Sequence, residues 1–258
     1  MNFAVLASSS KGNCIFAEGN DTRILVDAGS SWRSLASRLR HIGADPSSIS
    51  AILLTHDHSD HVSALETALK VRQLPLFATA GTIEAVCESV SAASDWPWTV
   101  IGAGEPFDVG AFSVLPFSVP HDAGDPVGFV LECGGTKLGI ATDLGESTAA
   151  ARLALRDCDA LALEFNHERR MLMDSSRPWS LKQRISGRSG HLSNDQAAEF
   201  LSEIATPRLS RLVPLHLSAE CNTVEAAMAA ARSSLLDCGL PTAALVPPVF
   251  PTELLAIP

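Results

Sequence analysis

Three observations in the sequence predict an α/β fold. Short apolar runs alternate with amphipathic segments over residues 23–91, which is the pattern of a sheet flanked by helices. Closely spaced β-type runs broken by Gly and Pro follow over 98–132, and several predicted strands end in a histidine or an aspartate. At 258 residues the chain is long for one domain and short for two, and we expect a single domain over 1–258.

Composition and charge restrict the class of protein. The formal net charge of −10 and the pI near 5.2 argue against a surface that binds nucleic acid throughout. The six cysteines are scattered without a Cys-x-x-Cys pair, so neither a disulfide framework nor a zinc ribbon is indicated. The first residues lack the basic start of a signal peptide, and no apolar run reaches the length of a membrane span. We therefore expect a cytoplasmic protein with no membrane partner; its oligomeric state is not indicated.

The first part of the chain predicts a β-meander. Its three short strands, at 3–7, 14–18 and 23–27, are separated by Ser-, Gly- and Asn-rich turns. The third strand ends in Asp27, and a helix is expected after it, over 32–42. Asp27 is interpreted either as the cap of that helix or as a carboxylate that orients a metal-bound imidazole.

A dense group of histidines and aspartates follows the buried strand predicted at 51–54. It consists of His56, His58, Asp60 and His61. Imidazole and carboxylate ligands suit zinc, manganese or iron, whereas a calcium site is nearly all oxygen. The first two histidines are two residues apart and point the same way on extended backbone, so they can hold one ion. The other two residues come a turn later, at a predicted helix start, where they can reach a second ion.

The middle of the chain continues the alternation and then becomes β-rich. Helices are expected at 62–72 and 79–91, on either side of a strand at 74–78. The β-type runs that follow lie at 98–101, 106–109, 111–118 and 127–132. His121 falls in the loop between the last two of these runs.

The last part of the chain repeats the design of a strand that ends in a polar residue. The strand at 137–143 ends in Asp143, the strand at 159–163 is followed by Glu164 and His167, and the strand at 211–216 ends in His216. Helices are expected from 194 to 204, where Ser193 and Gln196 form a capping box, and over 223–238, before a closing strand at 243–246. Residues 168–190 read as irregular and basic.

These motifs resemble, in order and over essentially the whole chain, those of the metallo-β-lactamase fold superfamily of metallohydrolases. They are Asp27 in Ile-Leu-Val-Asp-Ala-Gly, the His-x-His-x-Asp-His cluster, His121, Asp143 in Ala-Thr-Asp and His216 in Pro-Leu-His-Leu-Ser. The sequence is most similar to the YycJ/WalJ-type branch, which is related to ribonuclease Z-like nucleases. The stretches that carry this similarity are 6–14, 120–129, 163–167, 190–194 and 216–223. The resemblance implies a four-layer αββα sandwich with a site at one edge.

The resemblance also implies a ligand set for two divalent ions, zinc or manganese, with iron as another accepted metal. Carried over residue by residue, His56, His58 and His121 bind the first ion, and Asp60, His61 and His216 bind the second. Asp143 bridges the two ions. A shared water between two cations would be acidic enough to form a bridging hydroxide near neutral pH.

The function that this resemblance implies is a phosphodiesterase or nuclease acting on nucleic acid, as a 5′-exonuclease, through that hydroxide. Asp60 would help to orient the hydroxide, and His191 resembles the ribonuclease Z histidine that protonates the leaving oxygen, with Glu164 as its partner. The alternative for His191 is an exposed histidine near a helix cap. His167 is interpreted as lying behind the ligands, as facing substrate, or as structural.

The basic segment 168–190 carries six of the 19 basic residues in an acidic chain. It predicts a positive rim that guides a polyanion, with Arg170, Lys182 and Arg184 as substrate contacts. The alternative is an ordinary solvated face. Trp179 either stacks on a base or anchors the segment to the core.

Two other functions remain open from the residues alone. The same metals can serve a thioesterase or lactonase of the glyoxalase II type, or a metal-binding sensor without catalysis. The short interval from His121 to Asp143 has no room for the tRNA-clamping arm of ribonuclease Z. The interval from Asp143 to His216 is too short for a β-CASP domain. Both absences favour a compact nuclease or a smaller phosphodiesterase.

Overall fold

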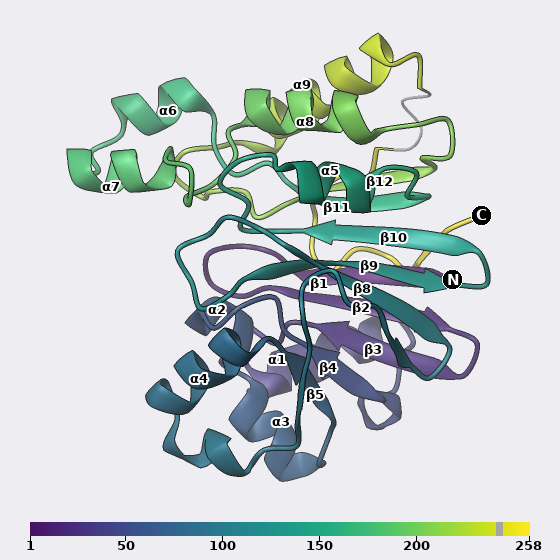
Figure 1. The fold of residues 1–258 in the computed structure, drawn as a ribbon. Helices are drawn as coiled ribbons and strands as arrows, with labels where there is room; N and C mark the ends of the chain where they lie inside the picture. Colours follow the sequence, from purple (N-terminus) through teal and green to yellow (C-terminus); the bar gives the residue numbers. More distant parts are fainter. Residues whose placement is uncertain (241–244) are drawn as a thin grey trace.

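Two mixed sheets pack face to face between two helical layers in the computed structural model, which describes residues 1–240 and 245–258 (Figure 1). The α/β class and the αββα sandwich are therefore confirmed. No helix within the described ranges combines the length and the apolar character that crossing a membrane requires.

The first sheet has the strand order β13-β1-β2-β3-β4-β5-β6. Strands β1, β2 and β3 form the predicted antiparallel meander, and β3 to β6 run parallel. Helices α1, α3 and α4 cover its outer face (Figure 1). The bounds are β1 Asn2–Ala7, β2 Cys14–Gly19, β3 Thr22–Val26, α1 Trp32–His41, β4 Ala51–Leu53, α2 Ser59–Val62, α3 Leu65–Val71, β5 Leu76–Ala78, α4 Ala80–Ser89, β6 Trp98–Val100 and β13 Leu255–Ala256, with 3₁₀ turns at Pro46–Ser48 and Ser91–Asp95.

The second sheet has the strand order β12-β11-β10-β9-β8-β7. Strands β7 to β10 are antiparallel neighbours, and β10, β11 and β12 are parallel. Helices α5, α8 and α9 cover its outer face, and α6 and α7 lie beside them at one edge (Figure 1). The bounds are β7 Phe107–Val109, β8 Phe112–Ser118, β9 Val127–Cys133, β10 Thr136–Ala141, α5 Ala149–Leu155, β11 Ala160–Glu164, α6 Arg169–Asp174, α7 Trp179–Ile185, α8 Asn194–Ile204, β12 Arg211–Leu215 and α9 Val224–Asp237.

Both faces of the central strands are buried, which explains their unbroken apolar runs. In β1, Phe3 and Val5 point into the layer between the sheets, while Ala4 and Leu6 pack in the layer under the helices. A third apolar layer lies between the second sheet and its helices, around Phe200 and other residues of α8 and α9. Three apolar layers therefore fix the sandwich and leave its edge for polar residues.

Residues 168–190 differ from the predicted irregular segment, because they contain α6 and α7. Glu168 caps α6 by accepting a hydrogen bond from the backbone N–H of Met171. The buried Lys182 ammonium donates to the carbonyls of Met173 and Ser175, at 2.6 and 2.7 Å, and so ties α7 to the end of α6. The short length of each helix hid its periodicity in the sequence.

Smaller differences concern boundaries. The helix expected over 62–72 is the shorter α3, with the separate one-turn α2 just before it, and α5 was not predicted. The capping box of Ser193 and Gln196 at the start of α8 is confirmed. Half of the closing strand predicted at 243–246 lies outside the described residues, since 243 and 244 are not described. Leu245, which is described, forms a parallel bridge with Leu212.

Candidate metal centre

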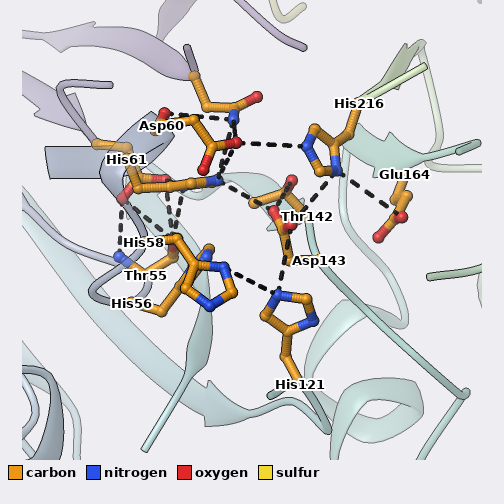
Figure 2. A network of polar contacts seen from close by, with 12 residues as sticks. Thr55, His56, His58, Asp60, His61, His121, Thr142, Asp143, Glu164 and His216 are labelled. Carbon is orange, nitrogen blue, oxygen red and sulfur yellow. Dashed lines mark hydrogen bonds and ion pairs between the residues drawn. The ribbon is translucent and has the colours of Figure 1, made fainter. Parts of the chain in front are cut away.

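Histidines and carboxylates from both sheets meet at one edge of the sandwich (Figure 2). They follow the ends of β3, β4, β10 and β12, where the carboxyl ends of parallel strands gather. Three of them, Asp27, Asp143 and His216, have left-handed backbone with φ of 63°, 55° and 53°. Aspartate tolerates this region better than most residues, and the turn lets the chain leave each strand sharply.

The first ligand group consists of His56, His58 and His121, whose donor atoms lie within 4.8 Å of one another. Nε2 of His121 is 3.4 Å from Nδ1 of His58, while Nδ1 of His121 lies 3.2 Å from the carbonyl of Gly190. That carbonyl can only accept, so it assigns the His121 proton to Nδ1 and leaves a lone pair on Nε2. Burial, and then the nearby His61, hold the pKa of His56 well below its usual value. Neutral rings with lone pairs facing one another suit a cation between them.

The second ligand group consists of Asp60, His61 and His216, also within 4.8 Å of one another. The Asp60 carboxylate lies 3.7 Å from Nε2 of His61 and 3.7 Å from Nε2 of His216. Burial favours neutral rings, but the Asp27 and Asp143 carboxylates raise the pKa of His61 to about 10. The potential at this group is therefore strongly negative, which favours a bound cation.

Asp143 lies between the two groups, as Figure 2 shows. Its carboxylate is 3.2 Å from Nε2 of His61, 3.4 Å from Nδ1 of His216 and 3.7 Å from Nε2 of His121. Burial opposes ionisation, yet His216 and His61 hold the pKa of Asp143 well below its usual value. A charged carboxylate that faces both groups is placed to contact two ions at once.

The donor set fits a pair of divalent ions. Nε2 of His56 and both ring nitrogens of His216 are buried without a hydrogen-bond partner among the described residues. A buried nitrogen of this kind costs free energy unless something binds it. The mixture of imidazole and carboxylate ligands is that of zinc, manganese or iron sites.

Asp27 supports the second group and does not cap a helix. Its carboxylate accepts from the backbone N–H of Thr55 at 2.9 Å and lies 2.8 Å from Nδ1 of His61, which turns Nε2 of that ring toward Asp60 and Asp143. Ser31 caps α1 instead, so the cap interpretation of Asp27 was wrong. Next to Asp27, a Cβ on Gly29 would lie 1.4 Å from the carbonyl oxygen of Asp60, so only glycine allows this approach.

His191 and Glu164 form a hydrogen-bonded pair beside the two groups. Nδ1 of His191 is 2.9 Å from Oε1 of Glu164, whose other oxygen accepts from the backbone N–H of Leu144 at 2.6 Å. Burial lowers the pKa of His191, but the Glu164 charge raises it above its usual value overall. The His191 side chain is 20% exposed and its ring centroid is 5.2 Å from those of His121 and His216. It therefore lies beside both ligand groups and is not the exposed loop histidine of the alternative.

The backbone around His191 is held by α7. The N–H of His191 donates to the carbonyl of Ile185 at 2.8 Å. A Cβ on Gly190 would lie 2.2 Å from the carbonyl oxygen of Arg184. Any larger residue at position 190 would therefore clash with the backbone of α7. Helix α7, which the sequence did not predict, thus positions His191.

His167 belongs to neither ligand group. It is 1% exposed, its Nδ1 has no hydrogen-bond partner among the described residues, and burial lowers its pKa to about 4. Its backbone pairs with Ser193, and its carbonyl accepts from the N–H of Asn194 at 2.8 Å. Of the three interpretations, this geometry favours the structural one, because the backbone of His167 joins the end of β11 to the start of α8.

A cavity of about 250 Å³ opens over the ligand groups. One wall comes from α6 and α7, with apolar Leu172, Leu181 and Ile185 and cationic Arg177 and Arg184. The Arg184 guanidinium pairs with Asp122, and that of Arg177 pairs with Glu220 at 3.2 Å.

The predicted substrate contacts do not all reach this cavity. Arg184 lines it, whereas Arg170 pairs with Asp174 at 3.4 Å on the exposed side of α6, and Lys182 is buried against backbone carbonyls. Trp179 is 64% exposed and does not anchor the segment. The sequence analysis missed Arg177 as a cavity residue; its place in the basic segment was the only signal.

Fold and site together define a class of protein. Residues 22–217 match the family model described as Beta-lactamase superfamily domain, and the chain belongs to that superfamily. Within it, the predicted resemblance to the YycJ/WalJ-type branch is confirmed. The Exodeoxyribonuclease YycJ of Bacillus anthracis is 29% identical over 239 residues, which cover 93% of this chain and 90% of the relative. The Exodeoxyribonuclease WalJ of Streptococcus pneumoniae is 30% identical over 227 residues, which cover 87% of this chain and 84% of the relative.

A solved structure supports the fold at lower identity. The Zn²⁺-bound PqqB of Methylobacterium extorquens superposes with a TM-score of 0.72 at 21% identity, over 95% of this chain and 97% of that one.

Proposed function

We propose that this chain is a metal-dependent exodeoxyribonuclease that hydrolyses the phosphodiester bonds of DNA. The observation that carries the proposal is the convergence of two ligand groups on Asp143, below a cavity that is also lined by His191, with the buried Glu164 behind it. A paired metal site with a proton donor beside it suits phosphoryl transfer, where charge develops on the attacking and the leaving oxygens. The names of the similar proteins YycJ and WalJ support DNA as the substrate.

The first group would hold one divalent ion and the second group another, with Asp143 reaching both. Zinc and manganese suit these ligands best, and iron fits the same nitrogen and oxygen donors. Bound ions supply a Lewis acid for the phosphoryl group and a water that is acidic enough to attack near neutral pH.

The protein itself supplies the proton for the leaving oxygen. Because Nδ1 of His191 faces Glu164, Nε2 is left to hold and donate a proton to substrate. The buried Glu164 carboxylate accepts from Nδ1–H and stabilises the doubly protonated ring, which is the form that carries a transferable proton on Nε2. Asp60 holds the second group together between His61 and His216.

Arg177 and Arg184 are the proposed contacts for the phosphates next to the scissile bond. Their guanidinium groups sit beside acidic partners, so substrate phosphate would compete with Glu220 and Asp122 for them. The apolar residues Leu172, Leu181 and Ile185 offer a surface on which a sugar or base can pack.

The test compares wild-type protein with His58→Ala on end-labelled single- and double-stranded DNA, RNA and a glutathione thioester. We expect stepwise loss of nucleotides from DNA, which stops after chelation and returns with Mn²⁺ or Zn²⁺. His58→Ala should lower the rate at least about a hundredfold, because it removes one of three ligands from the first group. Cleavage of the thioester alone would contradict the proposal in favour of a thioesterase. No cleavage of any substrate would favour a sensor.

Arg177→Ala and Arg184→Ala should each raise KM for DNA about tenfold with little change in kcat, because each removes one phosphate contact of about 1–2 kcal/mol. Each should also reduce the dependence of log affinity on log salt by about one. KM measured from 50 to 300 mM salt checks both effects. Arg232→Ala, on the exposed face of α9, is the matched control and should change neither value. An effect on kcat alone would place the two arginines outside substrate binding.

A further inference from the structure

The loop between β1 and β2, residues 8–13, reaches the second ligand group from both of its ends. At one end, the hydroxyl of Ser8 accepts a hydrogen bond from the backbone N–H of His216 at 2.7 Å. At the other end, the backbone N–H of Asn13 donates to the carbonyl of Asp60 at 2.8 Å. The loop belongs to the first sheet, whereas His216 follows β12 of the second, so the loop joins the two sheets at the site.

The Asn13 side chain contacts two ligand atoms at once. Its amide nitrogen is 3.1 Å from Oδ2 of Asp60 and 2.9 Å from Nε2 of His61. Its amide oxygen accepts from the N–H of Ser9 at 3.1 Å, which fixes the orientation of the amide. Asn13 is only 5% exposed, so this arrangement is enclosed. The amide nitrogen therefore holds Oδ2 of Asp60 and Nε2 of His61 next to each other.

Ser8 holds the third member of the second group, His216, by a hydrogen bond to the backbone of His216. His216 has a left-handed φ of 53°, a conformation that costs a histidine about 1 kcal/mol. Hydrogen bonds hold both sides of the residue, since Ser8 accepts from its N–H and the Asn166 amide donates to its carbonyl at 2.8 Å. Of these two, only Ser8 comes from the opposite sheet, and it fixes His216 relative to Asp60.

The first ligand group has other supports. Thr55 lies 3.0 Å from Nδ1 of His56, and the carbonyls of Asp122 and Gly190 hold the rings of His58 and His121 at 3.2 Å each. Among the described residues, no hydrogen bond joins the 8–13 loop to these three histidines. Thr55 also lies 3.2 Å from Nδ1 of His61, so it supports both groups, whereas the contacts of the 8–13 loop are with the second group.

We propose that the 8–13 loop sets the geometry of the second group alone, with Ser8 and Asn13 as its positioning residues, so that the two metal sites can be weakened separately. This inference rests on the two-ion site of the proposed function. Residues behind metal ligands typically change metal affinity by about 10- to 100-fold when they are replaced.

The test is a metal titration of chelator-stripped protein with Zn²⁺ or Mn²⁺, followed by calorimetry and by elemental analysis of the bound metal. Wild type should bind two equivalents. Asn13→Ala and Ser8→Ala should bind the first with unchanged affinity and the second about 10- to 100-fold more weakly. Ser9→Ala is the matched control in the same loop and should bind like wild type. Among the residues that the structure describes, the one hydrogen bond of the Ser9 hydroxyl is from the exposed N–H of Lys11 at 3.2 Å.

Ser8→Thr keeps a hydroxyl at position 8 and should restore the second equivalent, which separates lost positioning from lost folding. Equal weakening of both equivalents, or no change in either loop variant, overturns the inference while leaving the nuclease proposal intact. Wild-type protein that binds two equivalents without cleaving DNA overturns the nuclease proposal alone. Wild-type protein that binds fewer than two overturns both.

Discussion

Asp143→Asn is expected to lower DNA hydrolysis by roughly 10²- to 10⁴-fold and to reduce the bound metal from two equivalents to one. The carboxylate faces histidines of both groups at 3.2 to 3.7 Å and is buried. Removing one charge from such a buried arrangement costs about 3–5 kcal/mol, and about 1.4 kcal/mol is a factor of ten in rate. Asparagine has nearly the same shape and also tolerates left-handed backbone, so the fold should survive.

The measurements for Asp143→Asn are kcat on end-labelled DNA, metal content and the thermal midpoint. Asp157→Asn is the matched control, because Asp157 has a similar φ of 63° but lies exposed, away from the site. It should retain wild-type activity and two equivalents of metal. An Asp143→Asn protein that keeps both equivalents and full activity would show that the two groups do not share this carboxylate.

The second large effect concerns His191. His191→Ala should lower kcat on DNA by about 10²- to 10⁴-fold, the usual contribution of a positioned general acid. The loss should depend on the leaving group. With a 4-nitrophenyl ester of thymidine 5′-phosphate, whose leaving oxygen needs no proton, the same variant should lose less than about tenfold, since only the acid role is removed.

A comparison of both substrates for wild type, His191→Ala and Glu164→Gln measures this difference. Glu164→Gln keeps an acceptor for the N–H of Leu144 but removes the charge that raises the pKa of His191, so its loss on DNA should be smaller and in the same direction. His41→Ala, at the exposed end of α1, serves as the histidine control. An equal loss on both substrates would assign His191 to metal binding or packing.

The sequence predicts the sandwich because burial on both faces leaves a local pattern. Strands such as β4 and β11 are unbroken apolar runs, and the polar residue at each end marks the edge where the site forms. The gathering of the candidate ligands at one edge could be predicted for the same reason. His56 and His58 are neighbours in the chain, and the family motifs supply the three distant residues: His121, Asp143 and His216.

Other features depend on contacts that no local pattern encodes. The hydrogen bond from His216 to Ser8 joins residues 208 positions apart, and Ser8 alone reads as ordinary turn material. Lys182 was predicted to face substrate, yet its stem packs between two short helices and its ammonium binds carbonyls. Charge alone could not reveal this, because a lysine on a solvated face and a lysine that ties two helices together have the same local sequence signature.

The left-handed backbone at Asp27, Asp143 and His216 has a consequence for how this chain can change over generations. Glycine adopts that conformation without cost, so glycine at any of these positions would relieve local strain. Selection for stability alone would therefore drive these three positions away from aspartate and histidine. All three positions nevertheless carry an aspartate or a histidine in this chain, as selection for the chemistry of these side chains would leave them, and a lineage that abandoned the proposed activity should lose them first.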